Sequence, residues 1–104
     1  MQQREAKFRA MFKNMDTGRN VWITIGVNER YDQPGWAQVS PWVQYTGLLD
    51  SVGNEIYERD ILDEGGNVFE VGWIQEDASW NFDIRTARKC EVIGNVFEHP
   101  ELLK

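Results

Sequence analysis

The sequence is poor in the residues that build disulfides, metal sites and catalytic centres. It contains one cysteine, Cys90, and one histidine, His99, in 104 residues. A single cysteine excludes an intramolecular disulfide and a zinc site made of cysteines. The lone histidine precedes Pro100, and no nearby pattern supplies the nucleophile and orienting acid that a histidine-based triad needs. We therefore expect no enzymatic activity and no cofactor.

Long hydrophobic runs are also missing. No apolar stretch approaches the ~20 residues that a membrane-spanning helix requires. The opening residues, MQQREAKF, carry charges where a signal peptide needs an apolar run. The sequence therefore predicts a cytoplasmic protein without a membrane partner.

Aromatic side chains and negative charge are abundant. Five Trp, five Phe and three Tyr can fill the core of a single domain over residues 1–104 that has no disulfide to stabilise it. The formal net charge is −6, and residues 46–104 hold thirteen acidic and five basic groups against four and six in residues 1–45. Since proteins hold the DNA backbone mainly through Lys and Arg, this balance disfavours duplex DNA as a partner.

Alternation of apolar and polar residues predicts short strands separated by turns. The expected strands cover 7–12, 21–27, 43–48, 55–62, 68–75, 80–84 and 89–97, and residues 99–103 form one helical turn. About six or seven short strands with tight turns favour an all-β, mostly antiparallel fold, either a small barrel or a sandwich.

We also expect a set of apolar side chains in these strands to be buried. The expected core residues are Ile23, Ile25, Val68, Trp73, Trp80, Phe82, Val92 and Ile93. Cys90 shares a strand face with Val92, which predicts a buried small side chain. The alternative is a reactive thiol with a pKa lowered by the neighbouring Arg88 and Lys89.

Three segments, in the same order along the chain, resemble one known family. They are Arg4-Glu5-Ala6-Lys7-Phe8-Arg9-Ala10, then Gln44-Tyr45-Thr46-Gly47-Leu48 with Asp50, Gly53-Asn54-Glu55-Ile56-Tyr57-Glu58 and Asp60-Ile61, and finally Glu91 to Leu103. These segments are similar to the YopX family of phage and prophage proteins. The resemblance implies a small, barrel-like all-β fold and a phage or prophage origin, but no mechanism.

One position departs from that family's pattern, which has glycine where this chain has Arg59. A glycine there would serve a bulge or a close approach of the backbone. The arginine leaves two interpretations. Either the backbone does not need a positive φ at this position, or a ligand that approaches the glycine in relatives does not approach here.

Aromatic residues in and beside an irregular loop form the first candidate binding site. They are Tyr31, Trp36 and Trp42. Their rings could stack on the bases of single-stranded nucleic acid, although we also expect Tyr31 and Trp36 to fold back onto the core. The local basic group consists of Arg4, Lys7 and Arg9, of which we expect Lys7 and Arg9 to be exposed.

Two further groups of polar residues are candidate sites. Tyr45 and Thr46 could form a binding loop, or Tyr45 could pack inward while the chain turns at Thr46-Gly47. Asp60 lies in the densest run of carboxylates, together with Glu58, Asp63 and Glu64. Such oxygens could bind Mg²⁺ or Ca²⁺, but no known metal-binding pattern accompanies them, and a solvated strand end explains them as well.

The leading functional hypothesis is a phage- or prophage-encoded, non-enzymatic accessory protein that binds a host or phage protein. An acidic surface can steer a basic protein partner. The first alternative is a small nucleic-acid-binding barrel with exposed aromatic residues. The second is a small metal-dependent hydrolase that uses the carboxylates around Asp60.

Overall fold

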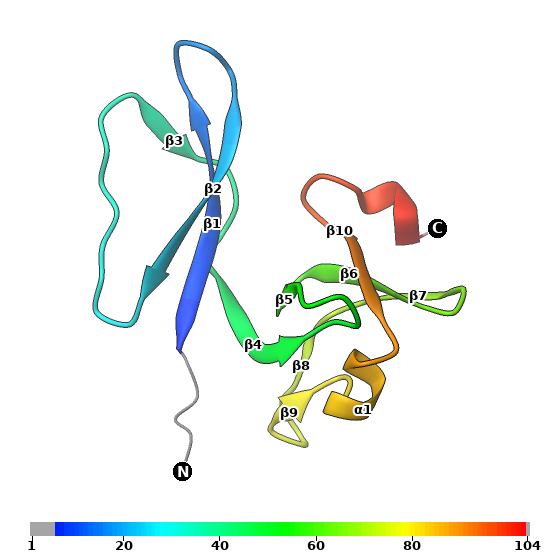
Figure 1. Cartoon of the computed structure of the whole chain (residues 1–104). Helices are drawn as coiled ribbons and strands as arrows, with labels where there is room; N and C mark the ends of the chain where they lie inside the picture. Colours follow the sequence, from blue (N-terminus) through cyan, green and yellow to red (C-terminus); the bar gives the residue numbers. More distant parts are fainter. Residues whose placement is uncertain (1–5, 104) are drawn as a thin grey trace. The chain divides into compact units, whose positions relative to one another are not determined.

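A computed structural model describes residues 6–103 of the chain (Figure 1). These residues form ten β-strands, a short α-helix and a 3₁₀ helix, η1 (Pro100–Leu103). The strands pair in antiparallel fashion. The predicted all-β, antiparallel fold and the predicted C-terminal helical turn are therefore confirmed, although the strands are more numerous than expected. Neither helix in the described part of the chain has the length and apolar character to cross a membrane.

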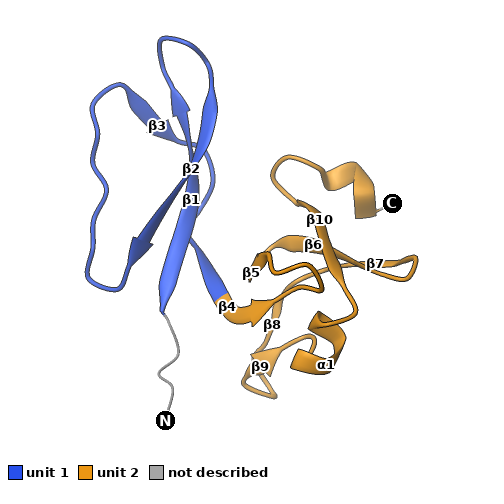
Figure 2. Cartoon of the chain, viewed as in Figure 1, with its two compact units in different colours: residues 1–45 blue, residues 46–104 orange. Residues whose placement is uncertain are grey.

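The chain divides into two compact units, residues 1–45 and residues 46–104 (Figure 2). The strand β4 (Val43–Leu49) begins in the first unit and ends in the second. The single domain expected from the chain length stays a prediction.

A long hairpin dominates the first unit. Its strands β1 (Lys7–Asn14) and β2 (Asn20–Gly26) keep one register from Lys7 opposite Gly26 to Lys13 opposite Asn20. The side chain of Asn14 closes the turn, because its Oδ1 accepts hydrogen bonds from the N–H groups of Asp16 and Thr17 at 2.9 and 3.0 Å. β1 also pairs with β3 (Trp36–Gln38) and with the start of β4. It is therefore the central strand of this unit.

The central position of β1 explains which residues of the first unit are buried. Ala10, Met11 and Phe12 follow one another in the sequence, and all three are buried. Consecutive burial means that both faces of β1 are covered, which strict alternation does not predict. The predicted core residues Ile23 and Ile25, on β2, are only half-buried.

Short strands make up the second unit. The end of β4 pairs with β5 (Glu55–Tyr57), and β6 (Asp60–Glu64) lies between β10 (Glu91–Asn95) and β7 (Asn67–Glu70). A separate hairpin contains β8 (Trp73–Ile74) and β9 (Ser79–Trp80), and the α-helix α1 covers Ile84–Ala87. The predicted strand over 68–75 is thus two strands, β7 and β8.

Two other predicted strands end earlier than expected. The strand over 55–62 is interrupted at Glu58-Arg59, and Arg59 has a φ of 74°. The interpretation that this position does not need a positive φ is therefore wrong. The strand over 80–84 stops at Trp80, because Asp83 caps α1: its carboxylate accepts a hydrogen bond from the N–H of Thr86 at 2.9 Å.

The core of the second unit is apolar and sealed. Its fully buried residues are Ile56, Leu62, Val71, Ala87 and Cys90, and Leu48, Phe69, Trp80, Phe82 and Val92 pack against them. Of the predicted core residues in this unit, Trp80, Phe82 and Val92 therefore contribute, and Val68 is half-buried.

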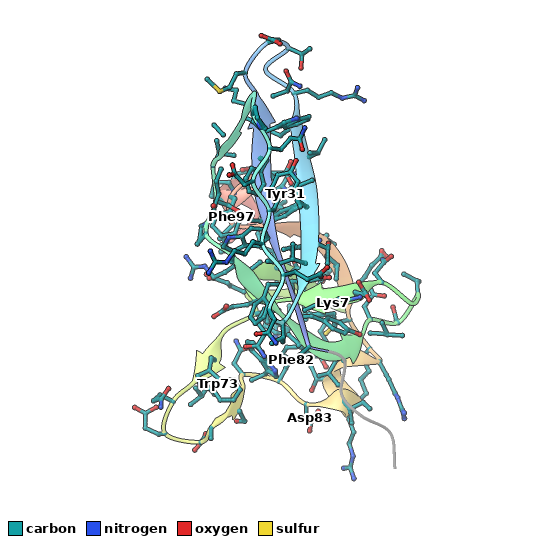
Figure 3. All side chains as sticks on the ribbon, turned by 90° about the vertical axis from the view of Figure 1, so that its left-hand side faces the viewer. Lys7, Tyr31, Trp73, Phe82, Asp83 and Phe97 are labelled. Atoms are coloured by element: carbon teal, nitrogen blue, oxygen red, sulfur yellow. The ribbon has the colours of Figure 1, made fainter. Side chains whose placement is uncertain are left out.

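Two of the predicted core residues are exposed, so their predicted burial is wrong. Trp73 lies on the β8–β9 hairpin (Figure 3) with 46% of its surface exposed. Its ring packs edge-on against Trp80 with 5.1 Å between centroids. Ile93 is 36% exposed, because it follows Val92, which packs against the core, and neighbouring residues of a strand point to opposite faces.

Candidate functional site

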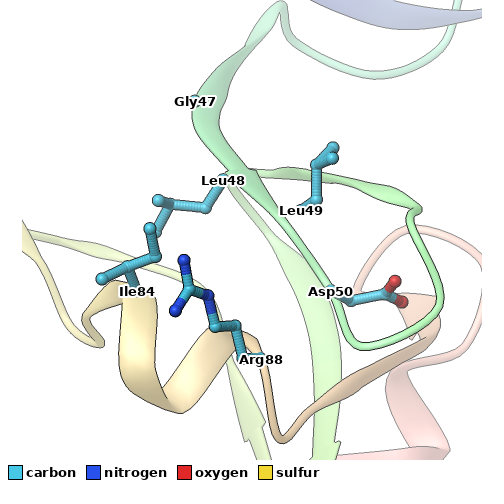
Figure 4. Close-up of a pocket in the computed structure, with 6 residues that line it drawn as sticks. All are labelled: Gly47, Leu48, Leu49, Asp50, Ile84 and Arg88. Atoms are coloured by element: carbon cyan, nitrogen blue, oxygen red, sulfur yellow. The ribbon is translucent and has the colours of Figure 1, made fainter.

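A pocket of about 300 Å³ lies in the second unit, between the end of β4 and α1 (Figure 4). Its lining residues are Gly47, Leu48, Leu49, Asp50, Ile84 and Arg88. In Figure 4 the side chain of Leu48 points toward Ile84, and the guanidinium of Arg88 points toward the same space. The pocket therefore combines an aliphatic wall with one positive charge.

Thr46 and Gly47 determine how Leu48 enters the pocket. The hydroxyl of Thr46 is buried, donates to the carbonyl of Ile56 at 2.8 Å and accepts from the N–H of Leu48 at 3.1 Å. Gly47 has a φ of 86°, a conformation that glycine adopts without a steric penalty. These contacts hold the backbone of Leu48 in one position.

Asp50 connects the two walls of the pocket. Its carboxylate accepts hydrogen bonds from the N–H groups of Val52 at 3.0 Å, Asn54 at 2.7 Å and Val92 at 2.9 Å, and from the side-chain amide of Asn54 at 3.1 Å. The N–H of Ser51 also donates to the carbonyl of Cys90 at 2.8 Å. The loop after β4 is thus hydrogen-bonded to the segment between α1 and β10, so the pocket is preformed.

The pKa of Asp50 reflects these contacts. Burial acts to raise it, but the hydrogen bonds from Val92, Asn54 and Val52 together outweigh burial and hold the pKa below its ordinary value of 3.8. The carboxylate is therefore ionised at neutral pH. Figure 4 shows it directed away from Arg88.

The helix α1 places the other wall. Ala87 anchors the helix in the core, and the N–H of Arg88 donates to the carbonyl of Ile84 at 3.2 Å. Because Ile84 and Arg88 are four positions apart, their side chains lie on the same face of the helical turn. Hydrogen bonding to Thr86 lowers the pKa of the capping Asp83.

The single thiol lies in the core of the second unit. Cys90 is completely buried, and burial raises its pKa, with further contributions from the carboxylates of Glu64, Asp63 and Asp50. The neighbouring Arg88 and Lys89 do not reverse this effect. The prediction of a buried small side chain is confirmed, and the reactive-thiol alternative is wrong.

The predicted aromatic site lies in the first unit and is partly packed away. Tyr31 and Trp42 both contact Phe12, with ring centroids 4.7 and 5.7 Å apart. Trp36 lies in β3 opposite Asn14. All three predicted residues are half-buried, so the expectation that Tyr31 folds back onto the core is confirmed. Their role in binding stays a prediction.

The basic side chains of the predicted group are less exposed to solvent than expected. The ammonium of Lys7 lies 4.9 Å from the centroid of the Tyr45 ring, and the guanidinium of Arg9 lies 4.2 Å from that of Trp22. Both cations are half-buried over rings, so the expectation that they are exposed is wrong. Arg4, the third member, lies outside the described residues.

Tyr45 and Thr46 are buried, with 9% and 1% of their surface exposed. The inward packing of Tyr45 and the hydrogen bonds of Thr46 support the structural alternative that the sequence left open. Their action as a binding loop stays a prediction, and it would require this segment to rearrange.

The carboxylates around Asp60 do not converge. Asp60 is buried and accepts a hydrogen bond from the N–H of Tyr57 at 2.8 Å, whereas Asp63 accepts one from the N–H of Gly66 at 2.8 Å in the following hairpin. Within residues 6–103, no three His, Cys, Asp or Glu side chains are grouped so that they could hold a metal ion. Asp60 and Asp63 thus close turns.

Sequence reasoning missed most of the pocket. Its apolar lining residues, Leu48, Leu49 and Ile84, were not proposed, and Arg88 was considered only for its effect on Cys90. One signal was available, since aspartate, as at Asp83, is a preferred residue at the start of a helix. Leu48 and Leu49 are also adjacent, and a strand that continues through both turns one of them outward.

The fold and the pocket together define a small all-β protein with a preformed apolar and basic cavity on its second unit. A family model described as YopX protein matches residues 3–104, and the chain belongs to the YopX family. Membership in this family suggests a phage-type protein. A comparison with curated proteins finds no match. The pocket residues Gly47, Leu48 and Asp50 fall in one of the segments that resemble the family in sequence.

Proposed function

We propose that this is a phage- or prophage-encoded accessory protein of the bacterial cytoplasm that has no catalytic activity and binds a host or phage protein. The observation that carries the proposal is the preformed pocket. Its apolar residues Leu49 and Ile84 have 48% and 51% of their surface exposed. Apolar groups held rigidly at a surface, with a charge beside them, are typical of protein-binding sites.

The size of the pocket favours a protein partner over a cofactor. Sites for small molecules usually enclose about 300–1,000 Å³ and bury most of the ligand. The volume of about 300 Å³ is at the lower limit of that range, and the pocket is open along Leu49 and Ile84. It suits one or two side chains of a partner, as in the central contacts of protein interfaces.

The test is a pull-down from the bacterial host and from phage-infected cells with three baits: the unchanged protein, Ile84→Asp and Val27→Asp. Val27, in the first unit, is a matched control because it is 54% exposed. We expect one protein to be retained in stoichiometric amount by the unchanged protein and by Val27→Asp, but lost with Ile84→Asp. Retention that does not depend on Ile84, or no retained protein, would contradict the proposal.

Single-stranded nucleic acid is the competing partner, and it has its own measurement. Labelled single-stranded and duplex oligonucleotides are titrated into the protein while Trp fluorescence is followed. We expect no binding at physiological salt, because Lys7 and Arg9 lie over aromatic rings. Micromolar affinity that weakens steeply with added salt would replace the protein-partner proposal by the nucleic-acid one.

A further inference from the structure

Positive charge in the second unit is concentrated beside the pocket. Residues 46–104 contain five basic and thirteen acidic side chains. Three of the five basic ones, Arg85, Arg88 and Lys89, lie in α1 or directly after it, and all three are exposed. An otherwise acidic unit therefore has one basic region, and this region adjoins the apolar pocket wall.

Arg88 is the basic residue that lines the pocket. Its guanidinium has no hydrogen-bond or ion-pair partner among residues 6–103, whereas the guanidinium of Arg59 pairs with Glu70 at 2.6 Å. The acid that shares the pocket lining, Asp50, is engaged by four hydrogen bonds and turned away from Arg88. Arg88 thus presents a planar set of donors that matches a carboxylate.

We infer that the pocket binds an acidic segment of a partner protein. A large aliphatic side chain of that segment packs between Leu48 and Ile84, and an adjacent Asp or Glu carboxylate forms a bidentate ion pair with Arg88. Arg85 and Lys89 attract further acidic residues of the same segment. This inference rests on the proposed function and specifies the chemistry of the partner at the contact.

The lining of the pocket favours an acidic peptide over nucleic acid. Bases of single strands are held by stacking on aromatic rings, and the side chains in the pocket are aliphatic apart from Asp50 and Arg88. An aliphatic side chain next to a carboxylate satisfies both parts of the site at once. A phosphate would satisfy Arg88 but leave Leu48 and Ile84 uncovered.

The test uses fluorescence anisotropy with the full chain and a short labelled peptide that has a central leucine flanked by glutamates. Three comparison probes are used. In the first peptide serine replaces the leucine, in the second lysines replace the glutamates, and the third probe is a labelled single-stranded oligonucleotide. We expect the Glu-Leu-Glu peptide to bind at least about tenfold more tightly than each of the other three. A preference for the lysine peptide or the oligonucleotide would overturn the inference.

Substitutions locate the binding. Arg88→Ala should weaken binding of the Glu-Leu-Glu peptide about tenfold, whereas Arg30→Ala, an exposed arginine of the first unit, should leave it unchanged. Arg88→Glu should reverse the preference toward the lysine peptide, an effect that misfolding could not produce. Peptide binding that is indifferent to Arg88 would overturn the inference.

The pull-down tests the proposed function, and the peptide titration tests the acidic-segment inference, so the two can fail independently. If a protein is retained through Ile84 but the acidic peptide does not bind, the proposed function stands and the acidic-segment inference is wrong. If neither the retained protein nor the peptide depends on the pocket, both are wrong.

Discussion

The two units supply hydrogen-bond partners to their backbone groups in different ways. The first unit relies on a long strand ladder, in which β1 keeps one register with β2 over its whole pairing. The second unit has strands of seven residues at most, and buried side-chain oxygens of Thr46, Asp50 and Asp60 accept hydrogen bonds from its backbone. Short ladders leave N–H groups without strand partners, and these oxygens supply them.

The units also differ in how completely they exclude water from their apolar residues. Five fully buried residues form the core cluster of the second unit. In the first unit Ala10, Met11 and Phe12 of β1 are buried, but the apolar residues of β2 are only half-buried. We therefore expect the same kind of truncation to have unequal effects in the core cluster and on β2.

Leu62→Ala should lower the free energy of unfolding by about 3–4 kcal/mol, because it leaves a cavity in a sealed core. Ile23→Ala, at a half-buried position of β2, should cost only about 1–2 kcal/mol, because water and neighbouring side chains can fill the space. Urea unfolding followed by circular dichroism measures both. Equal losses would mean that the two units do not differ in this way.

Phe82→Ala should lower the free energy of unfolding by about 2 kcal/mol, which is less than truncation of a fully buried phenylalanine would cost. Phe82 is only half-buried, and it packs on the core with its ring centroid 6.1 Å from that of Phe69. The counterpart in the first unit is Tyr31→Ala, which removes a half-buried ring from Phe12 and should cost a similar amount. An unchanged urea midpoint for Phe82→Ala would show that aromatic packing stabilises only the first unit.

Asp50→Asn tests the role of carboxylates in the second unit through pH. The pKa of Asp50 in the folded protein lies below its ordinary value of 3.8, so the ionised group stabilises the fold above that value. This stabilisation is lost as the pH falls through the folded-state pKa. At about pH 7 the variant should be about 1–2 kcal/mol less stable than the unchanged protein.

The difference between the two proteins should narrow at about pH 3, because Asp50 of the unchanged protein is then partly protonated and loses a stabilisation that asparagine never supplies. Urea titrations at the two pH values provide the measurement. Asp77→Asn, at an exposed turn position between β8 and β9, is the control and should show no such convergence. A constant difference for Asp50→Asn would show that its charge does not contribute.

Arg59→Gly should produce the smallest effect, an increase of about 0.5 kcal/mol in the free energy of unfolding. The backbone at Arg59 is held at a positive φ by hydrogen bonds to Val71 and from Val96, and glycine relieves most of that strain at some cost in chain entropy. Arg59→Ala keeps the strain, loses the exposed ion pair with Glu70 and should be slightly destabilising. If both variants behave alike in urea unfolding, the backbone is not strained there.

Regular alternation made much of the fold predictable. The β1–β2 hairpin and its turn follow directly from alternating residues and from Asn14 to Gly18. Prediction failed where one residue changes the local geometry, as at Arg59, whose positive φ interrupts a strand. Hydrogen bonds from Arg59 to Val71 and from Val96 to Arg59 hold this conformation, and a pattern along the sequence does not record them.

The candidate site was less predictable than the fold for a related reason. Leu48 and Arg88 are far apart in the sequence and come together through tertiary contacts, among them the hydrogen bond from the N–H of Val92 to Asp50 and the bond from the N–H of Ser51 to the carbonyl of Cys90. The helix α1 has four residues, too few to show a helical period. Aromatic and acidic residues attracted attention in the sequence, but the pocket uses aliphatic residues and one arginine.

Because Cys90 is buried, its reaction with a thiol reagent reports local opening of the protein. Because this is the only thiol in the chain and it lies in the sealed core of the second unit, a thiol-specific reagent can reach it only when that unit opens. The labelling rate under native conditions therefore records the opening of the second unit, with no engineered probe. A ligand that binds the pocket stabilises the closed form of this unit and should slow the labelling, so the rate could be used to screen for ligands.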